Sequence, residues 1–317
     1  MSNLMLNSLL SLSVTQKASD LHLSSGEAPR IRLNGQLQLL TDEKIPSSRL
    51  ESELLNLLNT SQKTQLQQNG YVDLAYHVSE IGRFRVNIFY QHRGISGVFR
   101  VINHDIPSLS QLSIPDVLPA LVKNTHGIIL VTGATGSGKS TTLASLIQHI
   151  NLTESKHIIT LEDPIEFIYQ NVQSLIEQRE VPHFTIAIDS LLRQDPDIIL
   201  FGELRNKTTI QAALTTAETG HLVLATLHTN SAIESINRII NVFSETERDF
   251  IRAQLSSSLK AIISQKLVAT ANGRRALFEI LINTPAVSNL INEGKIKQIY
   301  SLMQTGQQYG MQIMPDN

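Results

Sequence analysis

Residues 127–142 read GIILVTGATGSGKSTT, an apolar run followed by a turn of glycines, hydroxyl side chains and one lysine. Gly133, Gly138, Lys139 and Ser140 fit the phosphate-binding pattern G-x-x-x-x-G-K-[ST]. The glycines allow backbone amides to converge on phosphate oxygens, and a helix that begins near Lys139 would point its positive end at them. A chance match in a glycine turn is the alternative, at odds of about 1 in 100 for such a chain. The stretch therefore predicts a nucleotide-binding α/β domain.

Two side chains of this stretch have distinct expected roles. Lys139 is expected to reach the β and γ phosphates, and the Ser140 hydroxyl is expected to ligate Mg²⁺. The predicted nucleotide-binding residues of the stretch are Gly133, Ala134, Thr135, Gly136, Ser137, Gly138, Lys139, Ser140 and Thr141.

The composition is that of an ordinary soluble protein. Hydrophobic residues make up 41% and charged residues 17% of 317 residues, enough for two domains. The net charge of -2 gives no electrostatic reason to bind nucleic acid, and the absence of cysteine excludes disulfides, thiolate zinc sites and iron–sulfur clusters. No apolar run approaches the roughly 18 residues of a membrane span. The N-terminus, MSNLMLNSLLSLSV, favours an amphipathic helix over a signal peptide, so a cytoplasmic protein is expected.

The pattern changes along the chain in a way that predicts two domains. Residues 1–102 show successive strands with glycine turns and a helical segment at 48–60, typical of an α+β domain with an antiparallel sheet. Residues 103–116 contain prolines and little periodicity, which suggests a linker. Residues 117–317 begin with alternating apolar strands and helices, which favours a mostly parallel sheet covered on both faces. From about residue 233 we expect helices and one short strand at 276–280.

Acidic residues follow two of the predicted strands. In DPDIILFGE, residues 195–203, the strand is expected to lie beside the phosphate-loop strand, with Glu203 near the γ phosphate to polarise the attacking water. In ITLEDPIEF, residues 159–167, Glu162 is expected to hold Mg²⁺ through water or to orient the nucleophile. The alternatives are solvated strand ends and, for Asp163-Pro164, the start of a helix.

Two histidines bracket a further apolar strand in TGHLVLATLHTN, residues 219–230. His228 follows the strand, at the edge where phosphates are expected, and could sense the γ phosphate or couple to a neighbouring chain. His221 precedes the strand and is expected only to position other groups. A metal site is not expected, because no third ligand lies at suitable spacing.

Taken together, these motifs resemble the secretion ATPase superfamily of type II secretion and type IV pili. ASDLHLSSGEAPRIRLNG, GATGSGKSTT, ITLEDPIEF, LLRQDPDIILFGELRN and TGHLVLATLHTN occur in the order of that superfamily, over nearly the whole chain. Within it, the chain is similar to the PilT-like pilus retraction ATPases. The N-terminal domain is short, the four-cysteine zinc site usual in assembly motors is absent, and residues 284–312 resemble a C-terminal retraction segment with the core AVSNLINE.

The resemblance implies a fold and an assembly. It implies a PAS-like α+β N-terminal domain followed by a RecA-like P-loop ATPase domain, joined by a flexible linker, in a homohexamer that binds ATP and Mg²⁺. The N-terminal domain of a neighbour would complete each ATP site, with Arg85 and Arg100 reaching the phosphates. Without the resemblance these two would be ordinary surface arginines; Arg83 and Arg93 are further candidates.

Two positions depart from the superfamily pattern. Asp189 stands where an arginine is usual, four residues before Arg193, and Asn206 stands where an aspartate commonly follows GE-x-R. Because Lys139 and the acidic residues remain, we expect hydrolysis to persist with weaker activation at the interface between subunits.

The function implied is that of a hydrolysing motor that drives pilus retraction through an inner-membrane platform protein, which would hold it at the membrane periphery. Other pilus motor ATPases are possible partners, and no nucleic acid is expected. The catalytic residues implied are Glu203, Glu162 and His228. The alternatives are an assembly ATPase, a type II or type IVB secretion ATPase, a RecA-like nucleic-acid motor, or a non-hydrolysing accessory subunit.

Overall fold

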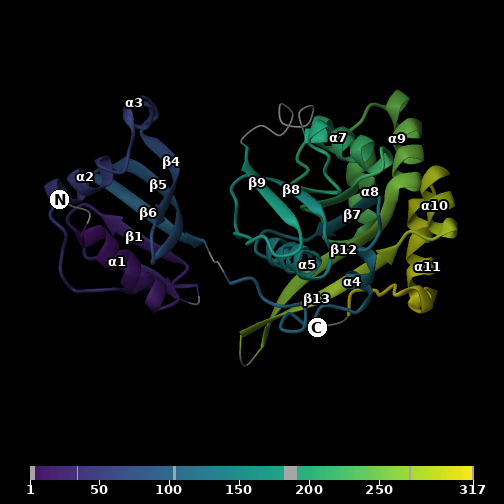
Figure 1. The fold of residues 1–317 in the computed structure, drawn as a ribbon, viewed down its shortest axis with the longest axis horizontal. Helices are drawn as coiled ribbons and strands as arrows, with labels where there is room; N and C mark the ends of the chain where they lie inside the picture. Colours follow the sequence, from purple (N-terminus) through teal and green to yellow (C-terminus); the bar gives the residue numbers. More distant parts are fainter. Residues whose placement is uncertain (1–3, 34, 103–104, 182–190, 271–272, 316–317) are drawn as a thin grey trace. The chain divides into compact units, whose positions relative to one another are not determined.

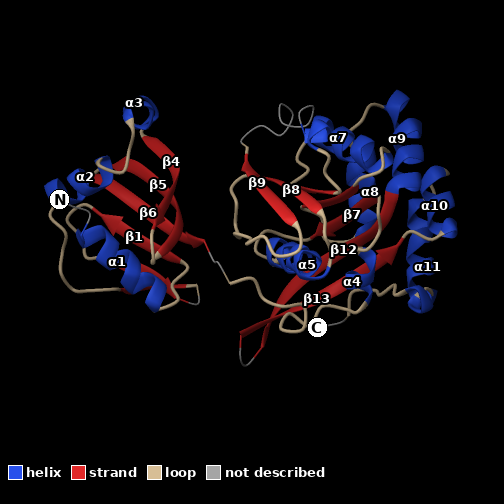
Figure 2. Cartoon of the chain, in the orientation of Figure 1, coloured by secondary structure: helices blue, strands red, loops and turns tan. Residues whose placement is uncertain are grey.

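The structure, a computed structural model, describes residues 4–33, 35–102, 105–181, 191–270 and 273–315. The chain divides into two compact units, Met1–His104 and Asp105–Asn317, each with its own sheet (Figures 1 and 2). The mixed α/β class expected from the sequence is confirmed. Among the helices that the structure describes, none is long and apolar enough to pass through a membrane.

The first unit is a six-stranded antiparallel sheet in the order β3-β2-β1-β6-β5-β4. Its elements are α1 Leu4–Thr15, β1 Asp20–Ser24, β2 Arg30–Leu33, β3 Gln36–Leu39, α2 Ser47–Leu55, α3 Thr60–Asn69, β4 Tyr71–Val78, β5 Gly82–Gln91 and β6 Gly94–Ile102.

Period-two alternation along the strands separates the two faces of this sheet. On β5, Phe84 and Val86 are fully buried, whereas Arg85 between them is exposed. The buried face packs against leucines of all three helices, including Leu10 of α1 and Leu54 of α2. The expected antiparallel sheet with helices on one face is therefore confirmed. Strand β1 and helix α3 were not predicted, because β1 is short and α3 is almost wholly polar.

The segment predicted as a linker, 103–116, is described from residue 105 onward. Within the second unit, Ile114 is buried in the core, and Leu109 and Leu112 pack against it. The hydroxyl of Ser145 on the helix that follows the phosphate loop donates a hydrogen bond to the Pro107 carbonyl at 2.7 Å. This part of the chain is thus attached to the second unit, and the domain boundaries stay a prediction.

The second unit contains a seven-stranded sheet in the order β13-β12-β7-β11-β10-β8-β9, in which only β13 is antiparallel to its neighbour. Its helices and strands are α4 Val117–Leu121, β7 Gly127–Thr132, α5 Lys139–Thr153, β8 His157–Glu162, β9 Leu175–Glu180, β10 Ile198–Phe201, α7 Lys207–Glu218, β11 Leu222–Leu227, α8 Ala232–Asn241, α9 Glu245–Ser258, β12 Leu259–Thr270, β13 Gly273–Ile282, α10 Pro285–Asn292 and α11 Ile299–Thr305, with short 3-10 turns at Leu192–Gln194, Ile296–Gln298 and Gln307–Tyr309.

Helices cover both faces of this sheet, as predicted. On β7, Ile128 and Leu130 join the core formed with α7 to α11, whereas Ile129 and Val131 join the core formed with α4 and α5. Strands buried on both sides are apolar at most positions, and all six residues of β7 and of β11 are buried.

Two expectations about this sheet are wrong. The strand of DPDIILFGE, β10, does not lie beside β7, because β11 pairs with both and separates them. Since both β10 and β11 are uniformly apolar and buried, their pattern suits any central position and does not fix the order. Residues 259–270, expected to be helical, form β12, which pairs with a β13 longer than predicted.

Candidate functional site

The phosphate loop connects β7 to α5 and depends on glycine at three positions. Gly133, Gly136 and Gly138 have φ angles of 147°, 77° and 90°, in the region that favours glycine. A Cβ atom on Gly133 would lie 2.3 Å from the Gln265 carbonyl oxygen. The loop can therefore take this shape only with glycine at the first position, as in loops whose backbone surrounds a phosphate.

Lys139 begins α5, as the motif predicts, and only 8% of it is exposed. Its Nζ donates hydrogen bonds to the carbonyls of Gly133 at 2.8 Å and Ala134 at 3.0 Å. Burial lowers the pKa of Lys139, and the carboxylates of Glu203 and Glu166 act in the opposite direction. The Lys139 ammonium group is thus hydrogen-bonded to the start of the loop, and it is attracted by the Glu203 carboxylate.

Gln265 on β12 holds the phosphate loop by hydrogen bonds, a role that was not predicted from the sequence. Its Nε2 donates to the Ser137 carbonyl at 2.7 Å, and its Oε1 accepts a hydrogen bond from the Thr142 hydroxyl at 2.7 Å. The side chain is buried. It therefore joins the loop to the first turns of α5 through one amide that can both donate and accept.

Glu203, His228 and the phosphate loop are brought together at the carboxyl ends of β10 and β11. The Nε2 of His228 lies 3.2 Å from Glu203 Oε1, and its Nδ1 lies 3.4 Å from the Thr135 hydroxyl. The other carboxylate oxygen of Glu203 accepts a hydrogen bond from Arg205 Nε at 2.8 Å. His228, which follows β11, therefore connects the predicted catalytic carboxylate to the phosphate loop. The carboxylate follows β10 and the loop follows β7, and β11 lies between these two strands.

Glu162 ends β8, next to β10. It accepts hydrogen bonds from the Thr160 hydroxyl at 2.7 Å and from Gln178 Nε2 at 3.4 Å. Burial raises the pKa of the Glu162 carboxyl, and these hydrogen bonds oppose the shift. A Cβ atom on Gly202 would lie 3.3 Å from the Glu162 Cα atom, so glycine before Glu203 permits close approach of the two strand ends.

The alternative interpretation of Asp163-Pro164 as a helix start is wrong, because residues 163–174 form a loop. Asp163 instead lies 3.8 Å from Arg205, which also binds Glu203. Arg205 is the arginine of the GE-x-R pattern, but no role was predicted for it. It neutralises acidic groups from two strand ends and thereby fixes where the Glu203 carboxylate points.

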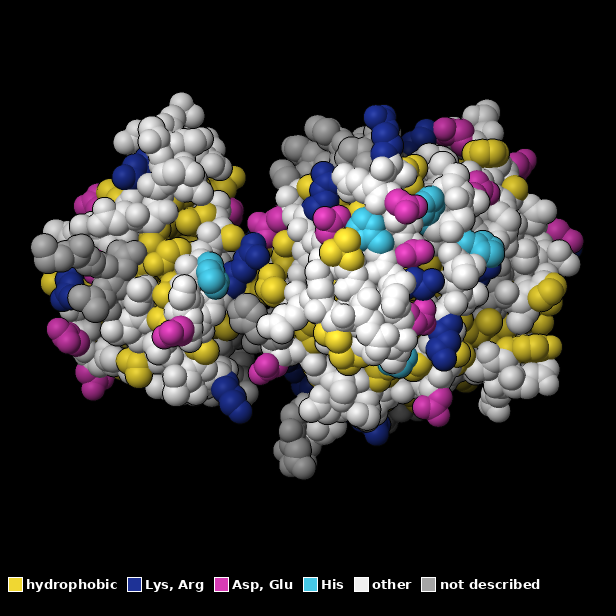
Figure 3. Space-filling model, in the orientation of Figure 1, with side chains coloured by type: hydrophobic (Ala, Val, Ile, Leu, Met, Phe, Trp, Pro, Cys, Tyr) yellow, Lys and Arg dark blue, Asp and Glu magenta, His cyan; other side chains and the backbone are white. Residues whose placement is uncertain are grey.

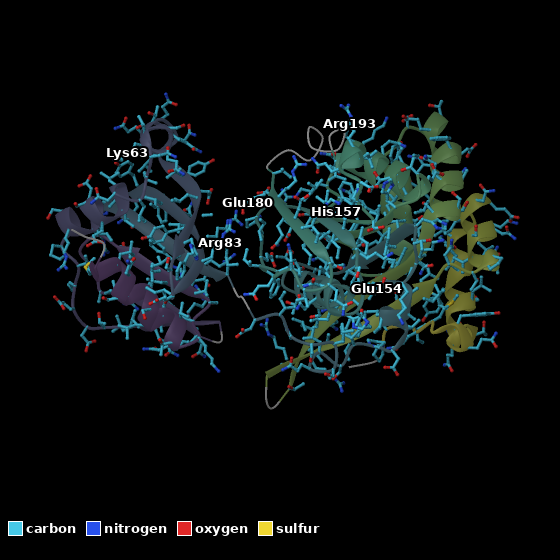
Figure 4. The ribbon with its side chains drawn as sticks, viewed as in Figure 1. Lys63, Arg83, Glu154, His157, Glu180 and Arg193 are labelled. Atoms are coloured by element: carbon cyan, nitrogen blue, oxygen red, sulfur yellow. The ribbon has the colours of Figure 1, made fainter. Side chains whose placement is uncertain are left out.

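The opposite end of the sheet holds a different set of charged groups. The Asp197 carboxylate accepts a hydrogen bond from the backbone N–H of His157, a residue labelled in Figure 4, at 2.8 Å. The rings of His157 and His221 lie 3.1 and 3.3 Å from backbone carbonyls. Asp195 has a φ of 54° where a short 3-10 turn ends. These residues hold strand ends in place, and His221 lies before β11, as its place in the sequence requires.

In the first unit, Arg85 and Arg100 are cross-strand partners on the exposed face of the sheet. Arg100 donates from its Nε to Asp20 at 2.9 Å. Arg93, a further candidate, forms an ion pair with Glu27 at the β5–β6 turn. Arg83 lies at the start of β5 (Figure 4). The structure places each unit separately, so the reach of these arginines toward a nucleotide stays a prediction.

The departures from the superfamily pattern have different outcomes. Asn206 is the N-cap of α7, and its side chain accepts a hydrogen bond from the Thr209 N–H at 3.0 Å. Asparagine caps a helix as well as aspartate does, so this departure leaves the local structure intact. Asp189 lies outside the described residues, and Arg193 is exposed in a 3-10 turn.

The residues of the phosphate loop fit a nucleoside triphosphate. Gly133 and Gly138 leave no room for side chains, the helix dipole and Lys139 supply positive charge, and the Ser137 hydroxyl is buried without a partner among the described residues. Figure 3 shows acidic, basic and histidine side chains interspersed over the visible face of the second unit, consistent with the small net charge.

Comparison with known proteins gives the same picture. Residues 2–314 match the model of the family described as "Type II/IV secretion system protein". The chain is 47% identical to the uncharacterized protein YggR of Escherichia coli K12, over 96% of this chain and 94% of YggR. It is 43% identical to the type IV pilus retraction ATPase PilT of Pseudomonas aeruginosa, over 96% and 90% of the two chains. A solved structure of the pilus retraction motor PilT with bound ADP is similar at a TM-score of 0.88 and 41% identity, over 93% of this chain and 89% of that one.

Proposed function

The chain belongs to the family of type II/IV secretion system proteins, and we propose that it is a Mg²⁺-dependent motor that retracts type IV pili. It is a PilT-like ATPase. The observation that carries the proposal is the contact of His228 with both Glu203 and Thr135, because it joins a carboxylate suited to activate water to the loop that would hold the triphosphate.

Each residue of the site has a role in hydrolysis under this proposal. Glu203 accepts the proton of the attacking water as general base, and Arg205 orients its carboxylate. Lys139 balances the charge of the β and γ phosphates. Ser140, in the first turn of α5, and Glu162, acting through water, would hold Mg²⁺, which would neutralise charge that develops on the phosphates.

His228 is assigned the task of reporting on the γ phosphate. Its ring contacts Thr135 on one side and Glu203 on the other, so any movement of the loop shifts the general base. The side chain is 42% exposed, which leaves it accessible to another protomer. This position supports a role in transmitting hydrolysis to the rest of an assembly.

Mechanical work requires a nucleotide that binds two conformations with different affinity. We assign this difference to a homohexameric ring in which Arg85 and Arg100 of one protomer contact the phosphates held by the next. Closure would occur when ATP is bound, and opening when the γ phosphate leaves. The motor would act on a platform protein in the inner membrane, remain at the cytoplasmic side, and work beside other pilus motor ATPases.

Deletion of the gene with complementation by a Lys139→Ala variant tests the function. A retraction motor predicts abundant surface pili and no twitching motility in both the deletion and the variant, with motility restored by the natural protein. Lys123→Ala is the matched control, since Lys123 is exposed on the same unit and outside the site. Loss of surface pili would instead indicate assembly, and loss of exported protein would indicate secretion.

The departure at position 189 gives a second test. If Asp189 weakens activation between subunits, then Asp189→Arg raises the ATPase rate of the purified protein by about two- to fivefold, the range of a single exposed charge pair. Steady-state phosphate release measures it. An unchanged or lower rate would contradict the hypothesis.

A further inference from the structure

Four charged residues form a row across the exposed face of the first sheet. Arg32 of β2 is the register partner of Asp20 on β1, Asp20 is the partner of Arg100 on β6, and Arg100 is the partner of Arg85 on β5. The row therefore contains three arginines and one carboxylate. Its net positive charge faces away from the apolar core of the unit.

Asp20 is the one member of the row that is buried. Only 6% of its side chain is exposed, against 66% for Arg100. One carboxylate oxygen accepts a hydrogen bond from Arg100 Nε at 2.9 Å, and the other accepts a hydrogen bond from the Ser19 hydroxyl at 2.8 Å. Asp20 is therefore fixed on both sides, while the guanidinium that it binds extends into solvent.

The geometry of this ion pair is specific. The guanidinium group carries donors on Nε and on two terminal nitrogens, and Asp20 uses the Nε. Arg32, on the other side of Asp20, donates instead to the Gly35 carbonyl at 2.8 Å and does not compete for the carboxylate. Within the described part of the chain, the two terminal nitrogens of Arg100 are left for a planar, bidentate contact with an anion such as phosphate.

Asp20 also offsets a local repulsion. Arg85 and Arg100 stand directly opposite each other, and like charges in that position destabilise a sheet and push the side chains apart. Among the described residues, Arg85 has no carboxylate that holds it in the same way. Without Asp20, the Arg100 guanidinium would have no fixed orientation and would move away from Arg85.

We propose that Asp20 is a positioning residue for ATP hydrolysis, which holds Arg100 by its Nε so that the terminal nitrogens meet the triphosphate of the neighbouring protomer. The inference rests on the proposed function, in which Arg100 acts on the next subunit. Asp20 acts only through Arg100 and does not itself contact the nucleotide.

The primary test compares Asp20→Asn with Asp73→Asn in the purified full-length protein. Asp73 lies on the same face, on β4, and accepts a hydrogen bond from Asn87, so its substitution removes the same charge without touching an arginine. Asp20→Asn is expected to lower kcat about tenfold with KM for ATP within about twofold, because the misplaced group acts mainly in the transition state. Asp73→Asn is expected to leave both unchanged.

The same substitution in an Arg100→Ala background separates positioning from general stability. Because Asp20 acts through Arg100, Asp20→Asn is expected to cause no further loss of kcat once Arg100 is absent. An equal tenfold loss in both backgrounds would overturn the inference, since it would show a structural effect. Wild-type turnover in Arg100→Ala would also overturn it, whereas the motor proposal fails separately if Lys139→Ala keeps full ATPase activity.

A milder variant covers the case in which Asp20→Asn does not assemble. Ser19→Ala keeps every charge of the row and removes the hydrogen bond to the second carboxylate oxygen, together with a longer one of 3.3 Å to the Arg32 carbonyl. It is expected to lower kcat about two- to threefold, with size-exclusion elution and melting temperature unchanged. Turnover equal to that of the natural protein would then count against the role of Asp20.

Discussion

The two ends of the parallel sheet carry the same kinds of residues and use them differently. At the amino end, Asp197 and His221 contact backbone groups, and His157 contacts Glu177 far from the phosphate loop. At the carboxyl end, Glu203 and His228 are bonded to each other, and His228 also reaches the phosphate loop. The comparison teaches that residue type does not decide chemistry here. The carboxyl ends of parallel strands lead into loops and helix N-termini, where an anion can bind.

The largest contrast between the two ends is expected for their carboxylates. Glu203→Gln is expected to lower kcat about 10²- to 10³-fold, because the amide cannot accept a proton from water. Asp197→Asn is expected to leave kcat within about twofold and to lower the free energy of unfolding by about 1 kcal/mol, through a weaker bond to the His157 N–H. Phosphate release and chemical denaturation measure the two effects. If Glu203→Gln and Asp197→Asn lowered kcat equally, the proposed difference between the two ends of the sheet would be wrong.

The histidines give an intermediate contrast. His228→Ala removes the contacts with Glu203 and Thr135 and is expected to lower kcat about tenfold. His221→Ala is expected to change kcat by no more than about twofold, since its ring contacts only the Thr216 carbonyl and the Thr219 hydroxyl. If His221→Ala proved the more harmful, the amino end of the sheet would have to be regarded as functional.

The smallest effect concerns stability and pH. Burial raises the pKa of Glu162 in the folded state, so the folded protein binds this proton more tightly than the unfolded chain does. Its contribution to stability is therefore full below the unfolded value of 4.5 and is lost as pH rises through the folded pKa. Glu162→Gln is expected to raise the melting temperature at pH 7 and to show a smaller gain at pH 4. A lower melting temperature at pH 7 would contradict this.

Local patterns predicted much of the second unit. The glycine spacing located the loop, the start of α5 and Lys139, since each depends on residues close in sequence. Uniformly apolar runs located β7, β8, β10 and β11. The order of the strands could not be predicted, because β10 and β11 are equally apolar and either could lie beside β7.

Contacts between distant parts of the chain were beyond the reach of such patterns. Arg205 follows the predicted Glu203 by two residues, yet its importance appears only when Asp163 is brought within 3.8 Å. Asp20 is one acidic residue in a short strand, and its proposed role depends on its ion pair with Arg100, 80 positions later in the sequence. Both are set by register and by the packing of strand ends, which a single sequence does not encode in an evident way.

The amide of Gln265 reaches the phosphate loop across 128 positions of sequence. A fragment ending before β12 would keep every recognisable nucleotide motif and still lack Gln265, the side chain that holds the loop by hydrogen bonds. Nucleotide affinity is therefore expected to depend on the folding of the chain from β12 onward, although that part contains none of the nucleotide motifs.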